Sequence, residues 1–348
     1  MSQLYTQLDP TEFAVGNTTT LSWETVAVPG TVPANSLMVC LVYSYGLTGA
    51  QVQSTDASAA PFVSGAINFY HTELVLVDGS SNVEIYQGDG ADKFYAIGYF
   101  YPLDFVHFEH DVGNANNNIG GTPTADTPDI ATWETISLTS LLQSGDSGKV
   151  AAAFIGHASQ NGTQGPNVRV VGSSDAYAPG VNTLNTRSYA LVGVDDSDNI
   201  EISRMQDPFA ADSTYYLAGY ILKTRGYNSV DPPVSLGSLT NGGWTTSLDL
   251  SGTLPSTAVH VCLREFFKPS SGQYDRAMIE AGGTQPSKYK RSTQVMDMAI
   301  AKVDDSQIVD YYLNRTSGSA DIEDWYITGY FTEVQASLPY VPKVLGTP

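Results

Sequence analysis

The stretch WYITGYF, residues 325–331, lies near the C-terminus and has two earlier counterparts in the same chain. These are FYAIGYF at residues 94–100 and YYLAGYI at residues 215–221. All three follow one pattern: an aromatic residue, a tyrosine, two variable residues and then Gly-Tyr. A phrase this specific, written three times, predicts an internal repeat, and repeats decide the architecture before individual strands are assigned.

Two further landmarks recur in the same order. A tryptophan opens a strand-like run in WETVAV (residues 23–28), WETISL (133–138) and WTTSLDL (244–250). An acidic turn follows in VDGSSN (77–82), VDDSDN (194–199) and VDDSQ (303–307). The tryptophan precedes the glycine of the closing phrase by 75, 86 and 85 residues, which predicts three copies of one module.

The runs between these landmarks are short, alternate with period two and are separated by turn residues, as in antiparallel sheets. Continuous apolar character in LMVCLVYS and AVHVCLRE predicts strands buried on both faces, and each acidic turn predicts a hairpin. The glycine of the closing phrase is expected to leave room for a ring such as the tryptophan of its repeat. We therefore predict an all-β chain of three tandem antiparallel, jelly-roll-like β-sandwiches.

The composition sets the expected boundaries of these sandwiches. Stretches rich in Asn, Gly, Thr and Pro between the repeats are expected to be linkers, and the two ends fall outside the repeats. The predicted division is an N-terminal arm (1–18), repeat 1 (19–110), a linker (111–128), repeat 2 (129–225), a linker (226–242), repeat 3 (243–335) and a C-terminal tail (336–348).

The formal net charge is −20, from 36 acidic and 16 basic residues. So negative a surface repels phosphate backbones and anionic lipids, so neither nucleic acid nor a membrane is an expected partner. The N-terminal residues carry no basic and apolar segments of a secretion signal, which predicts a soluble protein that is made in a cytoplasm and leaves the cell, if it does, by another route such as lysis. Cys40 and Cys262 are expected at equivalent core positions of repeats 1 and 3, as buried free thiols.

Three groups of side chains are candidates for binding. Asp195 and Asp198 in VDDSDN suggest a calcium loop, but the other copies lose these ligands, which favours a plain turn. His107, Glu109 and His110 suggest a zinc site, against the alternative of a solvated linker. Tyr177, Tyr227 and Tyr274 stand in loop-like contexts and are candidates for stacking on a glycan.

No nucleophile elbow, metalloprotease motif, phosphate loop or dinucleotide fingerprint is found in the sequence. Acidic pairs are numerous because the whole chain is acidic, so they identify no glycosidase dyad. We therefore expect no catalytic residues, no cofactor and no enzyme activity. A glycan-cleaving enzyme is the third alternative, after a structural protein and a glycan-binding module.

The repeat resembles modules of virion proteins from tailed bacteriophages and phage-like particles. Repeat 2 carries the resemblance best, in WETISL (133–138), NVRVVGSS (167–174), LVGVDDSDNIEI (191–202) and YYLAGYI (215–221). The resemblance implies a non-enzymatic virion component assembled in the host cytoplasm, such as a head decoration protein, head spike or fibre. Its expected partners are the major capsid protein or other virion proteins, and a host surface glycan is the alternative. Homo-oligomers are a further expectation, and three copies in one chain suggest the imitation of a trimer.

Overall fold

The computed structural model describes fourteen stretches of the chain, and the statements below concern these residues. They are residues 5–15, 21–45, 49–55, 69–101, 106–107, 132–159, 167–175, 186–204, 213–237, 243–268, 274–280, 289–291, 295–315 and 322–333. Antiparallel strands dominate them, and the helices among them are short 3₁₀ turns, including Thr139–Leu141 and Lys223–Arg225. None of these is a helix that could span a membrane. The all-β prediction is confirmed.

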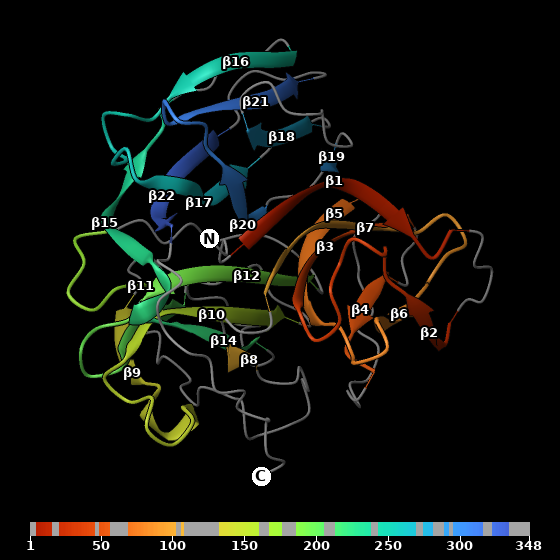
Figure 1. The fold of residues 1–348 in the computed structure, drawn as a ribbon, viewed down its shortest axis with the longest axis horizontal. Helices are drawn as coiled ribbons and strands as arrows, with labels where there is room; N and C mark the ends of the chain where they lie inside the picture. Colours follow the sequence, from red (N-terminus) through yellow and green to blue (C-terminus); the bar gives the residue numbers. More distant parts are fainter. Residues whose placement is uncertain are drawn as a thin grey trace.

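Six sheets are arranged as three pairs around a common centre (Figure 1). The sheet of each pair that lies toward the centre is called the inner sheet here. In sheet order the inner strands are β1 (Tyr5–Phe13), β7 (Lys93–Phe100), β3 (Leu37–Ser44) and β5 (Phe69–Leu76) in repeat 1; β8 (Val106–His107), β14 (Ser213–Leu222), β10 (Val150–Ser159) and β12 (Thr186–Gly193) in repeat 2; and β15 (Tyr227–Ser235), β22 (Ile322–Thr332), β17 (Ala258–Lys268) and β20 (Val295–Lys302) in repeat 3.

The second sheet of each pair, the outer sheet, also keeps one order. Its strands are β2 (Trp23–Ala27), β6 (Asn82–Tyr86) and β4 (Gln51–Gln53); β9 (Thr132–Ser137), β13 (Asn199–Arg204) and β11 (Asn167–Arg169); and β16 (Gly243–Asp249), β21 (Ile308–Arg315), β18 (Tyr274–Glu280) and β19 (Tyr289–Arg291). Position by position, the three sandwiches therefore have equivalent strands. That they descend from one duplicated module remains a prediction.

The closing phrase forms the strand next to the edge of each inner sheet and carries the same irregularity in every copy. One extra residue bulges out before the glycine, opposite Val39–Cys40, Phe154–Ile155 and Cys262–Leu263 of the neighbouring strands. A ring does cover two of these glycines, but it is a tyrosine of the edge strand. A Cβ on Gly98 would lie 1.9 Å from Tyr5 Oη, and one on Gly329 would lie 2.5 Å from Tyr227 Oη.

The tryptophans lie elsewhere, at the start of the first strand of each outer sheet. Trp23 packs against Tyr86 with ring centroids 5.6 Å apart, and the Arg169 guanidinium lies 4.0 Å from the centre of a Trp133 ring. The prediction that the closing glycine accommodates the tryptophan is therefore wrong in repeats 1 and 3, where a tyrosine of the edge strand covers the glycine. Sequence order could not show this, because strands adjacent in sequence alternate between the two sheets.

The hairpin prediction for the acidic turns is also wrong. Each turn closes with hairpin-like backbone bonds, such as Asp195 N–H to the Asn199 carbonyl at 3.1 Å. The strand before the turn then joins the inner sheet and the strand after it joins the outer sheet. The turn residues specify a tight reversal, but they do not specify that the two flanking strands pair with each other.

Residues expected in an arm and a linker form edge strands instead. Strand β1, within 1–18, pairs with β7, and β15, within 226–242, pairs with β22. Both register breaks coincide with prolines, at Pro10 and at Pro232–Pro233, which sheets tolerate at edges and bulges. Strand β8, placed in repeat 1 by the sequence, pairs with β14 of repeat 2. Residues 111–128 and 336–348 lie outside the described residues.

Each sandwich has its own core between its two sheets, built in repeat 1 around Cys40, Val83 and Phe94. A fourth core occupies the centre, where the opposite faces of the three inner sheets meet. Strand β3 is therefore buried on both faces, as its continuous apolar run predicts. The repeats are not separate beads joined by linkers, because they close around one shared interior.

Candidate functional site

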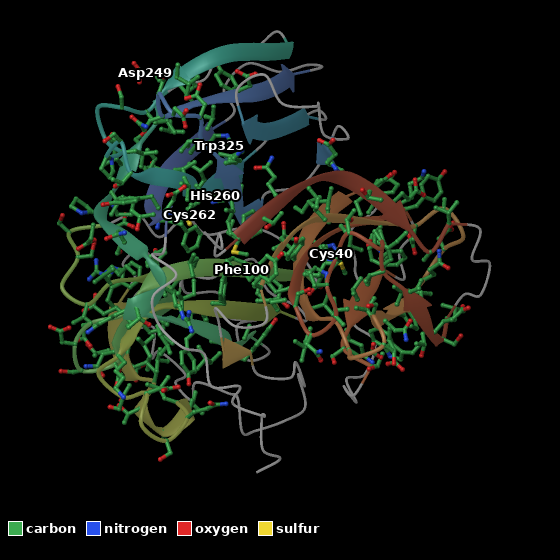
Figure 2. All side chains as sticks on the ribbon, viewed as in Figure 1. Cys40, Phe100, Asp249, His260, Cys262 and Trp325 are labelled. Atoms are coloured by element: carbon green, nitrogen blue, oxygen red, sulfur yellow. The ribbon has the colours of Figure 1, made fainter. Side chains whose placement is uncertain are left out.

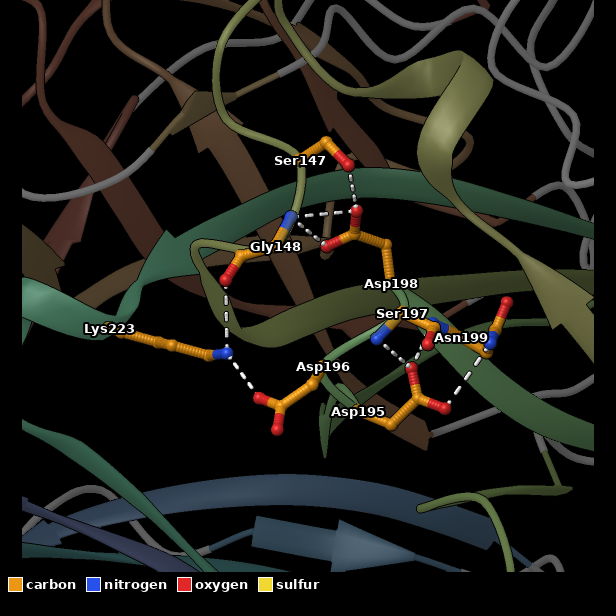
Figure 3. A network of polar contacts seen from close by, with 8 residues as sticks. All are labelled: Ser147, Gly148, Asp195, Asp196, Ser197, Asp198, Asn199 and Lys223. Atoms are coloured by element: carbon orange, nitrogen blue, oxygen red, sulfur yellow. Dashed lines mark hydrogen bonds and ion pairs between the residues drawn. The ribbon is translucent and has the colours of Figure 1, made fainter.

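In each acidic turn, backbone N–H groups occupy the first carboxylate. Asp195 Oδ1 accepts the N–H groups of Ser197 and Asn199 at 2.9 and 2.7 Å (Figure 3). Asp78 and Asp304 accept the equivalent pairs of N–H groups in repeats 1 and 3, at 2.7–2.8 Å. The pKa of Asp78 is lowered, because these hydrogen bonds to its carboxylate outweigh the opposing effect of burial.

The remaining carboxylates of the repeat 2 turn are also engaged. Asp198 is buried and accepts the Ser147 hydroxyl at 2.6 Å and the Gly148 N–H at 2.9 Å. Asp196 is exposed and forms an ion pair with Lys223 Nζ at 2.6 Å, which lowers the pKa of its carboxyl. Asp195 thus closes the turn and Asp198 ties the turn to the Ser147–Gly148 loop. No cluster of three or more metal-ligating side chains occurs within the described residues.

The other candidates from the sequence lie only partly within the described residues. His107 lies in β8, opposite Gly219, while Glu109 and His110 fall outside the described residues. Tyr177 is also outside them, and Tyr274 begins β18 as a strand residue. Tyr227 is buried beside Phe331, with ring centroids 5.5 Å apart, and burial raises the pKa of its hydroxyl. The prediction that Tyr227 is an exposed residue for stacking on a glycan is therefore wrong.

The two cysteines are buried free thiols, as predicted, but they are not equivalent. Cys262 lies opposite Gly329, a place that Val39 takes in repeat 1 opposite Gly98. This one-residue offset turns Cys262 toward the shared core and Cys40 toward the core of repeat 1 (Figure 2). Burial raises the pKa of both thiols, and for Cys40 the nearby Glu73 raises it further.

The shared core is the place where residues far apart in sequence meet. Phe100 of repeat 1 contacts Phe154 of repeat 2 and Phe331 of repeat 3, at centroid distances of 5.2 and 6.0 Å. His260 lies among them, fully buried, with its ring edge-on to Tyr5 at 5.3 Å. Both ring nitrogens of His260 lack a hydrogen-bond partner. Burial, reinforced by the charge of Lys302, lowers the pKa of its imidazole to about 3.

Contacts between neighbouring repeats follow a cyclic pattern. The Lys302 N–H of repeat 3 donates to Gln7 Oε1 of repeat 1 at 2.7 Å. At the equivalent place, Ser229 of repeat 3 packs on Gly193 of repeat 2, where a Cβ would lie 2.5 Å from Ser229 Oγ. Gln7 and Ser229 both stand opposite a closing glycine, so equivalent residues of the two edge strands face a neighbouring repeat. Two of the three interfaces between repeats are therefore built at equivalent positions.

Two buried polar bridges cross between repeats. Glu73 of repeat 1 accepts the Tyr189 hydroxyl of repeat 2 at 2.9 Å and lies 3.1 Å from His71 Nε2. Arg264 of repeat 3 forms an ion pair with Asp175 of repeat 2 at 2.8 Å. The second bridge borders a small, partly open cavity between repeats 2 and 3. Arg264 was not predicted from the sequence; its signal was the charged pair Arg264–Glu265 within the otherwise apolar run VCLREFF.

Comparisons with known proteins were made for the whole chain. No protein-family model matches it. No curated protein matches its sequence. Among solved structures, a chain from the X-ray structure of the entire lipid-containing bacteriophage PM2 is aligned over 94% of both chains, with 6% sequence identity and a TM-score of 0.14. A TM-score this low supports no conclusion about fold or function.

Proposed function

We propose that this chain is a non-enzymatic structural protein on the exterior of a phage or phage-like particle, where it decorates the capsid. The resemblance of its repeats to phage virion modules motivates the proposal. The supporting observation is the ring of three equivalent sandwiches closed around one core.

A ring of this kind offers three related outer faces to a partner. Capsid lattices repeat their own surfaces around threefold positions, so one such chain can make similar contacts up to three times. Each contact can then be weak while the sum holds the protein in place. The partner in this proposal is the major capsid protein, contacted at a position of local threefold symmetry.

The charge of the chain fits an exterior position. With a net charge of −20, neighbouring particles repel one another at low salt and stay dispersed. Among the described residues the interior is mainly apolar and aromatic, with few buried acids such as Glu73 and Asp198, so most of their charge lies outside the cores. The proposal needs no bound cofactor.

The test is to purify particles on a density gradient from lysates of cells that encode this chain. Co-banding with the capsid protein, and density for one copy on the outer surface at threefold positions, is the expected result. Recovery of all the protein in the particle-free fractions would overturn the proposal.

A second version of the test asks whether the ends of the chain hold it on the particle. Deleting residues 1–18 is unsuitable, because Tyr5 is buried in the shared core and β1 completes an inner sheet. Deleting residues 336–348 avoids the described strands. Loss of particle association, with an unchanged circular dichroism spectrum and melting temperature, would assign attachment to the tail; unchanged association would assign it to the faces of the sandwiches.

A further inference from the structure

The cavity between repeats 2 and 3 combines an apolar wall with a few polar groups. Leu191 of β12 and Leu263 and Met298 of repeat 3 supply apolar surface. The hydroxyl residues Ser229 and Thr328 and the charged residue Arg264 also line it. Concave sites that are mostly apolar, with a small number of polar groups, are typical of small-molecule sites.

Arg264 is the unusual member of this lining. Its side chain is nine-tenths buried, and its Nη1 pairs with Asp175 Oδ2 across the repeat interface at 2.8 Å. Its Nε and Nη2 are buried and have no hydrogen-bond partner. These two groups share one edge of the planar guanidinium, the edge with which arginine holds both oxygens of a carboxylate. A buried donor pair without an acceptor is costly, which favours any ligand that supplies two oxygens.

The fold does not require an arginine at this place. Arg264 stands opposite Tyr326, and the equivalent tyrosines Tyr95 and Tyr216 stand opposite Leu41 and Gly156. Repeat 1 thus builds the same strand pair with an aliphatic side chain at this position, and repeat 2 builds it with a glycine. Of these three equivalent positions, only the one at the interface between repeats 2 and 3 carries an arginine.

We propose that this cavity binds a small organic carboxylate, with the carboxylate on the Nε–Nη2 edge of Arg264. The body of this ligand would contact the apolar wall, and hydroxyl groups on the ligand would bond to Ser229 and Thr328. An acidic sugar is therefore the class of carboxylate that uses most of the lining. The charged lining residues are Arg169, Arg264, Asp175 and Asp231, which balance formally. Affinity therefore rests on the geometry of the fork and not on a positive field, and the site is independent of the proposed particle function.

The experiment is calorimetric titration of the full chain with glucuronate and with acetate, and with glucose as the neutral sugar. Saturable binding of both carboxylates, tighter for glucuronate, with no binding of glucose, is expected. Arg264→Lys keeps the charge beside Asp175 and removes the fork, so it should weaken glucuronate binding about tenfold or more. Arg225→Lys makes the same change outside the cavity lining and should leave binding unchanged.

Failure of wild-type protein to bind either carboxylate would overturn the proposal, as would equal binding by Arg264→Lys. Equal binding of glucose and glucuronate would overturn the carboxylate assignment. A crystal of the wild-type chain soaked in glucuronate gives an answer that does not depend on a variant's folding: density for the carboxylate on the Arg264 edge supports the site, and density elsewhere contradicts it. Particle association of Arg264→Lys should equal that of wild type, so this site and the proposed function fail separately.

Discussion

The shared core and the three repeat cores are built on opposite faces of the same strands, yet they differ in kind. Some equivalent positions in the repeat cores hold similar residues, such as the aromatic residues Phe94, Tyr215 and Trp325, although others, such as Met38, Ala153 and Val261, differ in size. Equivalent positions in the shared core hold dissimilar ones, which are Leu37, Ala152 and His260 at one level and Val39, Phe154 and Cys262 at the next.

The difference teaches what a single chain gains over a homotrimer. On a true threefold axis each residue meets its own copies, so only a size that fits three times is allowed. Here a large Phe154 is matched by the smaller Val39 and Cys262, and the small Ala152 by the larger Leu37 and His260. Interiors pack densely, so such unequal sets must complement one another as a group.

Phe154→Ala gives the largest expected effect. The substitution empties the centre of the shared core and should cost about 3–5 kcal/mol of unfolding free energy. Because the lost contacts join repeats, the calorimetric unfolding should also split from one transition into several. The matched variant Phe94→Ala removes an equally buried ring from the core of repeat 1. It should cost as much without loosening the other two repeats, and identical splitting by both variants would contradict the distinction between the cores.

His260 gives the next largest effect, through pH. Its pKa in the folded chain is about 3 and its ordinary value is 6.5, so the unfolded chain binds the extra proton between these values. Stability is therefore complete above pH 6.5 and is lost as the pH falls toward 3, by at most about 5 kcal/mol, of which about 3 kcal/mol is lost by pH 4. His260→Leu copies the residue of repeat 1 and should remove this part of the pH dependence. Urea denaturation of both proteins between pH 7 and 4 measures it; parallel curves would show that His260 does not titrate in this way.

Much of the fold was predictable from local patterns. The alternating runs, the position of each tryptophan at the start of a strand, and the double burial of β3 all follow from the sequence. What covers the second face of the inner sheets was not predictable. Apolar residues such as Leu37 and Val39 indicate that this face is buried, but they do not indicate which part of the chain buries it. The edge strands β1 and β15 were missed because polar residues and prolines conceal their alternation.

The candidate sites were predicted less well, for reasons of context. Tyr227 sits between a glycine and an asparagine, which looks like a loop, but its ring closes over Gly329. The offset between Cys40 and Cys262 was hidden because spacing from a tryptophan counts loop residues as well as strand residues. Only register opposite the closing glycine distinguishes the two faces of a strand.

Gly98→Ala should be less damaging than Phe154→Ala but still costly. The new Cβ would lie 1.9 Å from Tyr5 Oη and 2.3 Å from Tyr5 Cζ, so the edge strand must move, at a cost of about 2–3 kcal/mol. Gly329→Ala meets Tyr227 Oη at 2.5 Å and should cost somewhat less. Gly30→Ala, with no atom within 4 Å, is the control and should change the melting temperature little. Equal stability of all three variants would refute the role of the closing glycine.

Asp304→Ala probes the acidic turns and should have the smallest effect. Asp304 accepts the N–H groups of Ser306 and Ile308, both at 2.8 Å, and their loss should cost about 1 kcal/mol. Asp305 is exposed in the same turn, and Asp305→Ala should change stability by less.

Calcium chloride should not raise the melting temperature of the wild-type chain beyond the effect of an equal ionic strength of sodium chloride. A calcium-specific rise that is lost in Asp195→Ala would instead make repeat 2 differ from its neighbours by binding an ion, because its turn alone carries a third carboxylate, Asp198.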